Sequence, residues 1–528
     1  MADSEASVIQ FAAQLLTRAP LLSFTFLSFS IILVYLLVNE TIRYRVRNPH
    51  FTGPPGLPVI GNIRDIRFHA PSKFQEWSKE YGDVYQIQLG NIPILVVNSA
   101  AAAKELIGGN AHAVSSRPVF YTFHKIVAKT AGATIGTSPL SDDLKRRRRA
   151  AAAALNKPSV NSYAPHLDIE TLTFIKDCLR YGDAGNRSFY PMLLIQRVVL
   201  SMVLTVNWGT RMVSSDSELF KEIIEVEGGI VKTRMTTQNF QDYVPLLRLN
   251  PFSGDSKQAA NWRRRRDVYL NMLDNDLRER MEKGIHTPCI QSNCILDPEA
   301  KLSRQDLTTI SISLIQGGVE TVAGTVSWGI ALLANRPDIQ AKALQEIRQF
   351  YAESSDILCD AHDQEKCTYV AAFVRECLRY FTVLRLALPR STVQEVNFRG
   401  KPIPAGSTIF LNAWACNMDP ALWRDADVFR PERWIERPDA PLFTYGLGYR
   451  MCAGYPLANR ELYLLFMRII SCFEIVKGSE VDVDPVSGTD LPGAPGRKPR
   501  KYEVFFRPRD KMRLEEVIEK KETESEVS

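Results

Sequence analysis

The stretch that most constrains the fold of this chain is Phe443-Thr-Tyr-Gly-Leu-Gly-Tyr-Arg-Met-Cys-Ala-Gly454, which lies in the last fifth of the sequence. Its glycines let the backbone turn sharply and pass close to a flat partner. The apolar residues from Pro456 onward predict a helix, so Cys452 lies near a helix N-terminus, where amide groups and the helix dipole favour a thiolate. A thiolate in a tight glycine turn suits a metal ion, and a single cysteine ligand suits haem iron.

A lone cysteine is more often a buried structural thiol. Here, however, the spacing Phe-x-x-Gly-x-Gly-x-Arg-x-Cys-x-Gly specifies six positions within twelve, and the segment resembles the haem-binding loop of the cytochrome P450 family. The resemblance implies that Cys452 is the axial ligand of the iron of haem b. It also implies that Phe443, Gly446 and Arg450 belong to the cofactor site.

Leu307 to Leu333 is a long, weakly polar stretch that predicts a central buried helix. Two glycines in a helix interior cost about 1 kcal/mol each relative to alanine, so Gly317 and Gly318 need a reason, either a ligand or a tightly packed helix. Gly317-Gly-Val-Glu-Thr321 resembles the family motif Ala/Gly-Gly-x-Asp/Glu-Thr. The resemblance implies that the glycines leave room for dioxygen, and that Glu320 and Thr321 relay protons to it.

Glu376-Cys-Leu-Arg379 is a Glu-x-x-Arg pair at helical spacing. Such pairs are usually weak surface salt bridges. The family joins this pair to an arginine of a later motif, here Phe429-Arg-Pro-Glu-Arg433-Trp, which implies a buried structural cluster of Glu376, Arg379 and Arg433. Arg390, in Leu388-Pro-Arg390, is a further candidate for binding a haem propionate, together with Arg450.

Two acids, five consecutive cations (Lys145 to Arg149) and a run of alanines predict a helix. Runs of cations also occur in nuclear-localisation and nucleic-acid-binding segments, but a helix points these side chains in different directions. The family has a Trp-x-x-x-Arg motif here, whose arginine binds a propionate. Leu144 stands in place of the tryptophan and Arg148 in place of the arginine, with Arg147 as the alternative.

The N-terminal part predicts a membrane anchor. After a short segment, 1–20, Leu21 to Val38 contains neither charge nor proline, and its length as a helix, about 27 Å, matches the ~30 Å hydrocarbon core of a membrane. Arginines at positions 43, 45 and 47 favour a cytosolic C-terminal side. A cleaved signal peptide is the alternative, but no small-residue cleavage site follows the apolar run. Residues 39–62 form a basic, proline-rich hinge.

The resemblance covers residues 53 to 506 and implies the cytochrome P450 fold: mainly α with small β-sheets (α+β), here preceded by one transmembrane helix. We expect the catalytic domain over 63–508 and a charged, disordered tail over 509–528. Gly90-Asn91, between the apolar runs 84–89 and 92–97, predicts a hairpin. A net charge of +6 is too small to indicate a nucleic-acid partner.

Residues 115–140 are rich in aromatic and small residues, and in the resembled fold this region forms a wall of the substrate pocket. The alternative is that these side chains only pack the loop. The candidates for contact with an aromatic ring are Phe120, Tyr121 and Phe123, and those for contact with a carboxylate are His124 and Lys125.

Several stretches, such as Tyr243-Val-Pro-Leu-Leu-Arg-Leu-Asn-Pro251, resemble one fungal branch, the phenylacetate and hydroxyphenylacetate hydroxylases. The resemblance implies a haem-thiolate monooxygenase that inserts one atom of O₂ into a small aromatic substrate. Electrons would come from a separate NADPH-dependent reductase at the endoplasmic reticulum membrane, with the catalytic domain facing the cytosol. Two alternatives remain open. One is a fungal secondary-metabolite enzyme with a larger substrate, and the other is a reductase-independent isomerase or dehydratase of the same fold.

Overall fold

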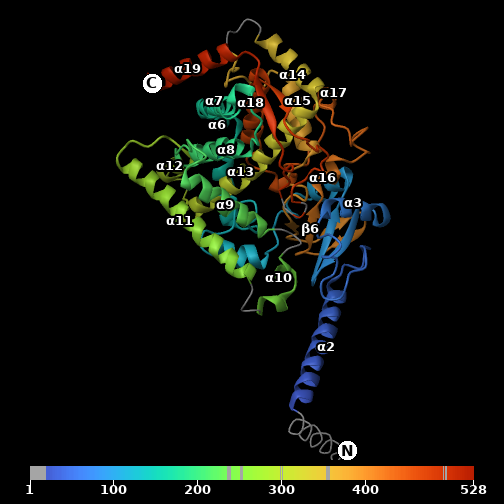
Figure 1. Cartoon of the computed structure of the whole chain (residues 1–528). Coiled ribbons are helices and arrows are strands. Elements are labelled where there is room, and N and C mark those ends of the chain that lie inside the picture. The colour runs from blue at the N-terminus through green and yellow to red at the C-terminus, as the bar shows by residue number, and fades with distance from the viewer. Residues whose placement is uncertain are drawn as a thin grey trace, which may run out of the picture.

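The computed structural model describes residues 20–234, 239–249, 254–297, 299, 301–351, 357–491, 493 and 496–527. A long helix, α2 (Pro20–Val46), projects from a body of helices with three small sheets among the described residues (Figure 1). The predicted fold class, mainly α with small sheets after one N-terminal apolar helix, is confirmed. The expected short segment 1–20 lies outside the described residues except for Pro20.

Helix α2 is long and apolar enough to cross a membrane over Phe24–Val46, and only 6% of this window is buried in the protein. The helix continues to Val46, past the predicted end at Val38, since the next helix-breaking residue is Pro49. Its last turns attach to the hinge: Arg43 Nη1 donates to the Leu57 carbonyl at 3.0 Å. The exposed apolar surface of α2 suggests a membrane anchor.

The largest sheet has the strand order β1-β2-β6-β3. The hairpin of β1 (Val84–Leu89) and β2 (Ile92–Val97) confirms the prediction around Gly90-Asn91, and β2 pairs in parallel with β6 (Thr408–Leu411). β3 (Arg390–Ser391) pairs with β6 at the edge, which brings Arg390 into the sheet. The two-stranded sheets are β4 (Val396–Phe398) with β5 (Lys401–Ile403), and β7 (Phe473–Lys477) with β8 (Val504–Pro508).

Helix α13 (Arg304–Asn335) runs through the middle of the body and confirms the predicted central helix. It is also long and apolar enough to cross a membrane, but 78% of the relevant window is buried among other helices. Neighbouring helices include α8 (Met192–Trp208), α15 (Thr368–Tyr380) and α18 (Tyr455–Cys472). A Cβ at Gly329 would lie 2.2 Å from the Phe466 ring, so α13 and α18 approach each other closely only because this residue is glycine.

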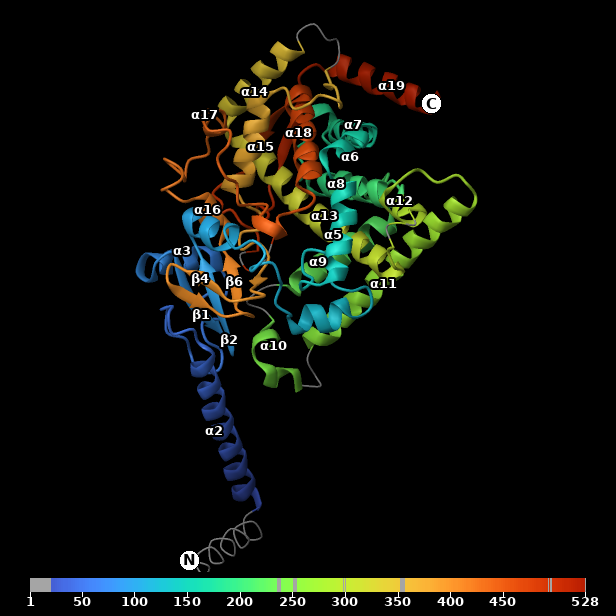
Figure 2. The ribbon, with the colours of Figure 1, turned by 180° about the vertical axis from the view of Figure 1, so that it is seen from behind.

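The remaining helices surround this centre. Figure 2 shows the main sheet on one flank of α13, and α9 and α11 on the other. The α-helices not yet named are α3 (Ala70–Tyr81), α4 (Ala100–Ala103), α5 (Asp142–Ala154), α6 (Lys157–Ser162), α7 (Ala164–Tyr181), α9 (Glu218–Lys232), α10 (Phe240–Tyr243), α11 (Gly254–Glu282), α12 (Ile290–Leu296), α14 (Pro337–Phe350), α16 (Ala413–Asn417), α17 (Arg433–Glu436) and α19 (Lys511–Val527).

The C-terminal tail differs from the expected disordered segment 509–528, because α19 occupies Lys511–Val527. Leu514 and Ile518 are four residues apart, so they lie on one face of the helix. They are 0% and 5% exposed and belong to the main hydrophobic cluster. Burial of two apolar residues at helical spacing therefore stabilises a helix in a segment whose charged composition predicts disorder.

Candidate functional site

A cavity of about 420 Å³ lies inside the body, lined by α13, the loop that carries Cys452 and the segment before α5. Nearly all the predicted cofactor and catalytic residues meet in its wall, although they come from four separate parts of the chain. Phe443 does not line the cavity; it is 2% exposed and packs in a neighbouring cluster. The predicted residues in the wall are Arg148, Gly317, Gly318, Glu320, Thr321, Arg390, Gly446, Arg450 and Cys452.

The cysteine loop turns through two glycines in the left-handed region, Gly446 (φ 70°) and Gly448 (φ 65°). A side chain is strained in this conformation, which explains the glycines of the motif. The amide of Cys452 donates to the Tyr445 carbonyl at 2.9 Å, and α18 starts at Tyr455, one residue before the predicted start at Pro456. The loop thus holds the Cys452 thiol at the cavity wall.

Cys452 is exposed, and its residue lines the cavity. Desolvation raises the pKa of this thiol, while hydrogen bonds from the Gly454 and Tyr455 amides and the charge of Arg148 lower it. Desolvation outweighs these effects, so the thiolate needs a further positive charge. A metal ion supplies such a charge and deprotonates a coordinating thiol.

Arg450 and Arg390 are buried beside this loop. The guanidinium of Arg450 donates to the carbonyls of Ser115 (2.8 Å), Ile135 (2.9 Å) and Ser138 (3.0 Å). Arg390 donates to the Leu447 carbonyl at 2.6 Å. Burial, followed by the charges of neighbouring arginines, lowers the pKa of Arg450 to about 9 and that of Arg390 to about 10.

Of the five consecutive cations in α5, Arg148 is the one that lines the cavity. Its Nη2 donates to the Met451 carbonyl at 3.1 Å. Arg147, the predicted alternative, points elsewhere and forms an ion pair with Asp306 at the start of α13, 2.5 Å from Nε to Oδ1. Leu144, in the position of the expected tryptophan, is fully buried in a separate apolar cluster.

A fourth arginine, Arg117, was missed by the sequence analysis. Its Nε donates to the Gly136 carbonyl at 2.8 Å and its Nη1 to the Pro389 carbonyl at 2.7 Å. Burial lowers its pKa well below the usual range, and the charges of Arg450, Arg390 and Arg148 lower it further. The only signal in the sequence is an isolated Ser-Ser-Arg-Pro, which belongs to no motif of known chemistry.

Four arginines form one cationic group: Arg117, Arg390 and Arg450 are buried and Arg148 is half-buried. None of them has an acidic partner in the described part of the chain. Uncompensated buried charge is costly. A ligand with two carboxylates, such as haem, would compensate two of these four positive charges, and arginine pairs well with carboxylates. The residues present therefore fit a haem, with the thiol of Cys452 and the arginines in the same cavity wall.

The glycine pair in α13 serves two purposes. A Cβ at Gly317 would meet no atom within 4 Å, so this position opens onto the cavity. A Cβ at Gly318 would lie 2.8 Å from Cγ2 of Val203 in α8, so this position allows tight helix packing. Both explanations that the sequence left open therefore apply, one to each glycine.

Glu320 and Thr321 lie in the cavity wall but bond to different partners. The Thr321 hydroxyl donates to the Gly317 carbonyl at 2.6 Å. Glu320 forms an ion pair with Lys498, 2.6 Å from Oε2 to Nζ, and these side chains are 13% and 25% exposed. Lys498 comes from the loop between β7 and β8 and was not predicted.

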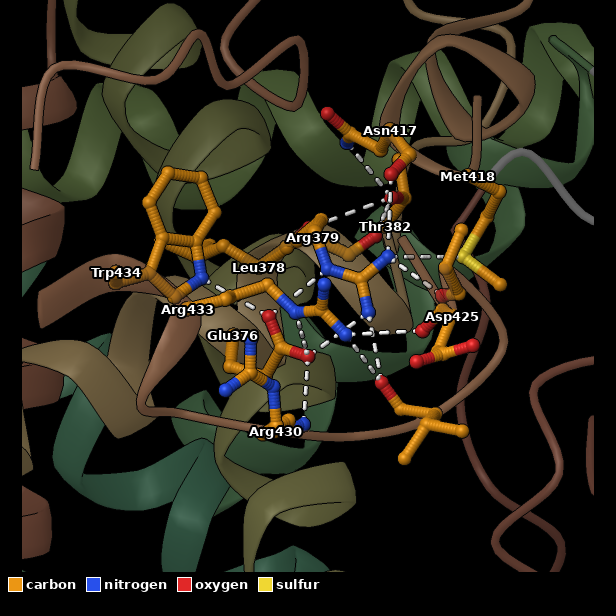
Figure 3. Close-up of polar contacts among 12 residues, drawn as sticks. Glu376, Leu378, Arg379, Thr382, Asn417, Met418, Asp425, Arg430, Arg433 and Trp434 are labelled. Atoms are coloured by element: carbon orange, nitrogen blue, oxygen red, sulfur yellow. Dashed lines mark hydrogen bonds and ion pairs between the residues drawn. The ribbon is translucent and has the colours of Figure 1, made fainter. Parts of the chain in front are cut away.

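The predicted structural cluster assembles as expected (Figure 3), and Glu376, Arg379 and Arg433 do not line the cavity. Glu376 is fully buried, and its carboxylate accepts from Arg379 Nη2 (2.8 Å) and Arg433 Nε (3.1 Å). The Trp434 indole (2.9 Å) and the Arg430 amide (2.8 Å) donate to the same carboxylate. The cluster joins α15 to the segment that contains α17.

Among the predicted substrate contacts, Phe120, Phe123 and His124 line the cavity, and Tyr121 and Lys125 do not. Both ring nitrogens of His124 are engaged: Nδ1 accepts from the Phe120 amide at 3.0 Å and Nε2 lies 3.1 Å from the Thr137 carbonyl. Burial lowers the pKa of His124. A neutral, fully bonded histidine stabilises the loop and offers no charge to a carboxylate.

Comparisons with known proteins give one matching family and two similar enzymes. The model of the family described as Cytochrome P450 matches residues 51–506. A 3-hydroxyphenylacetate 6-hydroxylase of Emericella nidulans is 56% identical over 500 residues, which are 94% of this chain and 96% of that protein. A phenylacetate 2-hydroxylase of the same organism is 35% identical over 93% of this chain and 97% of that protein.

Proposed function

We propose that this chain, which belongs to the cytochrome P450 family of haem-thiolate monooxygenases, hydroxylates the ring of phenylacetate or of one of its hydroxy derivatives. The observation that carries the proposal is the 56% identity, over nearly the full length of both chains, with a protein named for that chemistry. Position 6 of 3-hydroxyphenylacetate and position 2 of phenylacetate are both adjacent to the acetate side chain. We therefore expect oxidation at a ring carbon next to this side chain.

We assign the iron of haem b to Cys452 and the two haem propionates to Arg117, Arg148, Arg390 and Arg450. When bound, the haem supplies the activation of O₂ for insertion of one oxygen atom into the substrate. The loop glycines, such as Gly446, let the backbone approach the flat cofactor. Gly317 leaves space on the α13 side of the cavity, where a side chain would narrow it.

Thr321 and Glu320 are the proposed route for protons. The Thr321 hydroxyl hydrogen is directed to the Gly317 carbonyl, so its oxygen has lone pairs free to accept a proton. Lys498 holds Oε2 of Glu320 in the ion pair, so Oε1 is the oxygen that remains for proton exchange with the Thr321 hydroxyl. The alternative, an isomerase or dehydratase of the same fold, needs no proton relay, so the acid and hydroxyl in the wall favour the monooxygenase.

We propose that electrons come from a separate NADPH-dependent reductase, and that α2 anchors the protein in the endoplasmic reticulum membrane with the catalytic domain on the cytosolic side. The three arginines that follow the apolar run of α2 support this orientation.

The test uses the purified full-length protein and Cys452→Ala. The reduced, carbon monoxide-bound protein should give the red-shifted Soret band of a haem-thiolate protein, and the variant should lose it. Turnover is then measured with phenylacetate and 3-hydroxyphenylacetate, with and without NADPH and a cytochrome P450 reductase. We expect hydroxylation next to the side chain only in the complete mixture. An intact spectrum without any product from either acid would refute the proposed substrate class.

A further inference from the structure

The cavity wall contains a second pair of buried arginines, separate from the four assigned to the propionates. Arg385 precedes β3 and is 3% exposed, and Arg497 lies in the loop between β7 and β8 and is 4% exposed. Neither forms an ion pair with any residue that the structure describes. Two buried cations without a counterion are costly, so this pair needs an explanation.

The two guanidinium groups are only partly hydrogen-bonded. Arg385 Nη2 donates to the Pro485 carbonyl, and the guanidinium lies 5.2 Å from the centre of the Trp414 ring. Arg497 Nη1 donates to the Leu491 carbonyl at 3.0 Å. The buried Nε atoms of both have no partner. Arg385 Nη1 and Arg497 Nη2 likewise make no hydrogen bond within the described ranges, so donors remain for a ligand.

The charges around the pair do not neutralise it. Burial lowers the pKa of Arg385 to about 9 and that of Arg497 to about 10, and the charge of Arg497 contributes to the shift at Arg385. His69 stays neutral, since burial and both arginines lower its pKa. Asp484 favours the charged form of Arg385 from a distance, but it accepts the amides of its own turn. Glu320, the acid that contacts this loop, is paired with Lys498.

One other arginine in the wall, Arg234 after α9, is a weaker candidate for an anion. It donates to the Gln316 side chain and lies 4.2 Å from the centre of the Phe123 ring. The carboxylate of Glu227 favours its charged form. The Nε of Arg234 also lacks a partner, but the largest effect on its charge after burial is the favourable one of Glu227. For Arg385 the corresponding effect is the unfavourable charge of Arg497, with Asp484 contributing less, and no acid contributes at Arg497.

We propose that Arg385 and Arg497 together bind the carboxylate of the substrate. This inference rests on the proposed function, because an arylacetate is the small anion that the cavity would admit. Arginine matches a carboxylate with two parallel hydrogen bonds. Anchoring the carboxylate would select acids over neutral aromatic molecules. It would also limit which ring carbon faces the reacting centre, since the carbons next to the side chain lie nearest the anchor.

The test compares the holoenzyme with Arg385→Gln and Arg497→Gln, and the control is Arg234→Gln, the same change at the arginine whose charged form Glu227 favours. Dissociation constants for phenylacetate and for phenylacetamide, its neutral analogue, are measured from the change in haem absorbance on binding. Each glutamine variant should bind the acid about 10- to 100-fold more weakly and the amide nearly as well as the wild type. Arg234→Gln should keep the wild-type ratio of acid to amide.

Two further variants, Arg385→Lys and Arg497→Lys, keep the positive charge but cannot donate the two parallel hydrogen bonds of a guanidinium. They replace the glutamine variants in the test if those do not fold. We expect them to bind the acid about severalfold more weakly than the wild type with the Soret band intact. The inference would be refuted, and the proposed function left standing, if all the Arg385 and Arg497 variants kept the wild-type ratio of the dissociation constants for acid and amide. The same conclusion would follow if only Arg234→Gln changed that ratio. A wild-type enzyme that binds neither compound would refute the proposed function as well.

Discussion

The Glu376 cluster gives the sharpest prediction about stability, and the change is Glu376→Gln. The carboxylate is 0% exposed and accepts hydrogen bonds from Arg379, Arg430, Arg433 and Trp434 (Figure 3). A carboxamide has nearly the same shape, but it carries no charge and turns an NH₂ group toward at least one guanidinium. The variant therefore leaves two buried cations without their anion.

The magnitude follows from what the two arginines retain. Arg379 also donates to the Ala426 carbonyl at 2.8 Å and Arg433 to the Val428 carbonyl at 2.8 Å, so both stay hydrogen-bonded. What is lost is charge compensation, and breaking one partner of a buried ion pair costs about 3–5 kcal/mol. A domain of this size loses roughly 1 °C of melting temperature per kcal/mol. We expect the midpoint for thermal loss of the Soret band to fall by about 3–5 °C, with a lower yield of folded protein.

The assay follows the Soret band of wild type, Glu376→Gln and Glu436→Gln during heating. Glu436 lies in the same segment and pairs with Arg430, 2.5 Å from Oε1 to Nη1, but the two side chains are 53% and 43% exposed. Its loss should therefore leave the midpoint nearly unchanged. Equal midpoints for the two variants would show that the buried carboxylate does not hold the cluster together, and would refute the reasoning.

Three further predictions follow from contacts described above. Gly318→Ala should destabilise the protein by about 1–3 kcal/mol, because the new methyl group overpacks the contact with Val203 of α8. Gly317→Ala should keep the wild-type unfolding midpoint, but it should weaken the change in haem absorbance on substrate binding, because its methyl group enters the cavity. Hydrogen bonds from Arg147, Ser303 and Arg146 outweigh the effect of burial and lower the pKa of Asp306 to about 2 from 3.8. Above pH 4 the ionised carboxylate therefore contributes roughly 2 kcal/mol to the free energy of unfolding, and this contribution is lost as the pH falls through 2. Asp306→Asn should be less stable than the wild type at pH 7, and its free energy of unfolding, measured by urea titration, should change less as the pH is lowered. Deleting residues 1–38 should move the protein from detergent-dependent membrane fractions into the supernatant with an unchanged Soret band, because the Arg43 contacts remain.

Local patterns predicted those parts of the site where chemistry and spacing coincide in one short segment. The cysteine loop, the Glu-x-x-Arg pair and the glycine-rich turn of α13 each carry their residues within a few positions. The structure brings Cys452, Gly317 and Thr321 to one cavity wall, whereas Phe443 packs in a neighbouring cluster. In α5, the sequence predicted the helix but not which cation faces the cavity. The choice between Arg147 and Arg148 depends on Asp306, which is more than 150 positions away in the chain.

Isolated residues were the ones that the sequence could not reveal. Arg117, Arg385, Arg497 and Lys498 lie in loops, belong to no motif, and resemble ordinary surface cations in composition. Their position becomes distinctive only when distant carbonyls surround them. Arg117, for example, donates to Gly136 and to Pro389. A buried cation without an acid is a property of tertiary packing, and hence no periodicity or spacing predicts it.

The central helix shows why neighbours in sequence need not act as one unit. Successive residues of an α-helix point about 100° apart, so Gly317 faces the cavity while Gly318 faces α8. The same rotation separates Thr321, bonded within α13, from Glu320, which reaches across to Lys498 on another loop. A proton relay through this pair therefore depends on a contact that the motif does not contain. Since Lys498 directly follows Arg497, a substrate carboxylate bound at Arg497 would lie next to the residue that holds the acid of the relay.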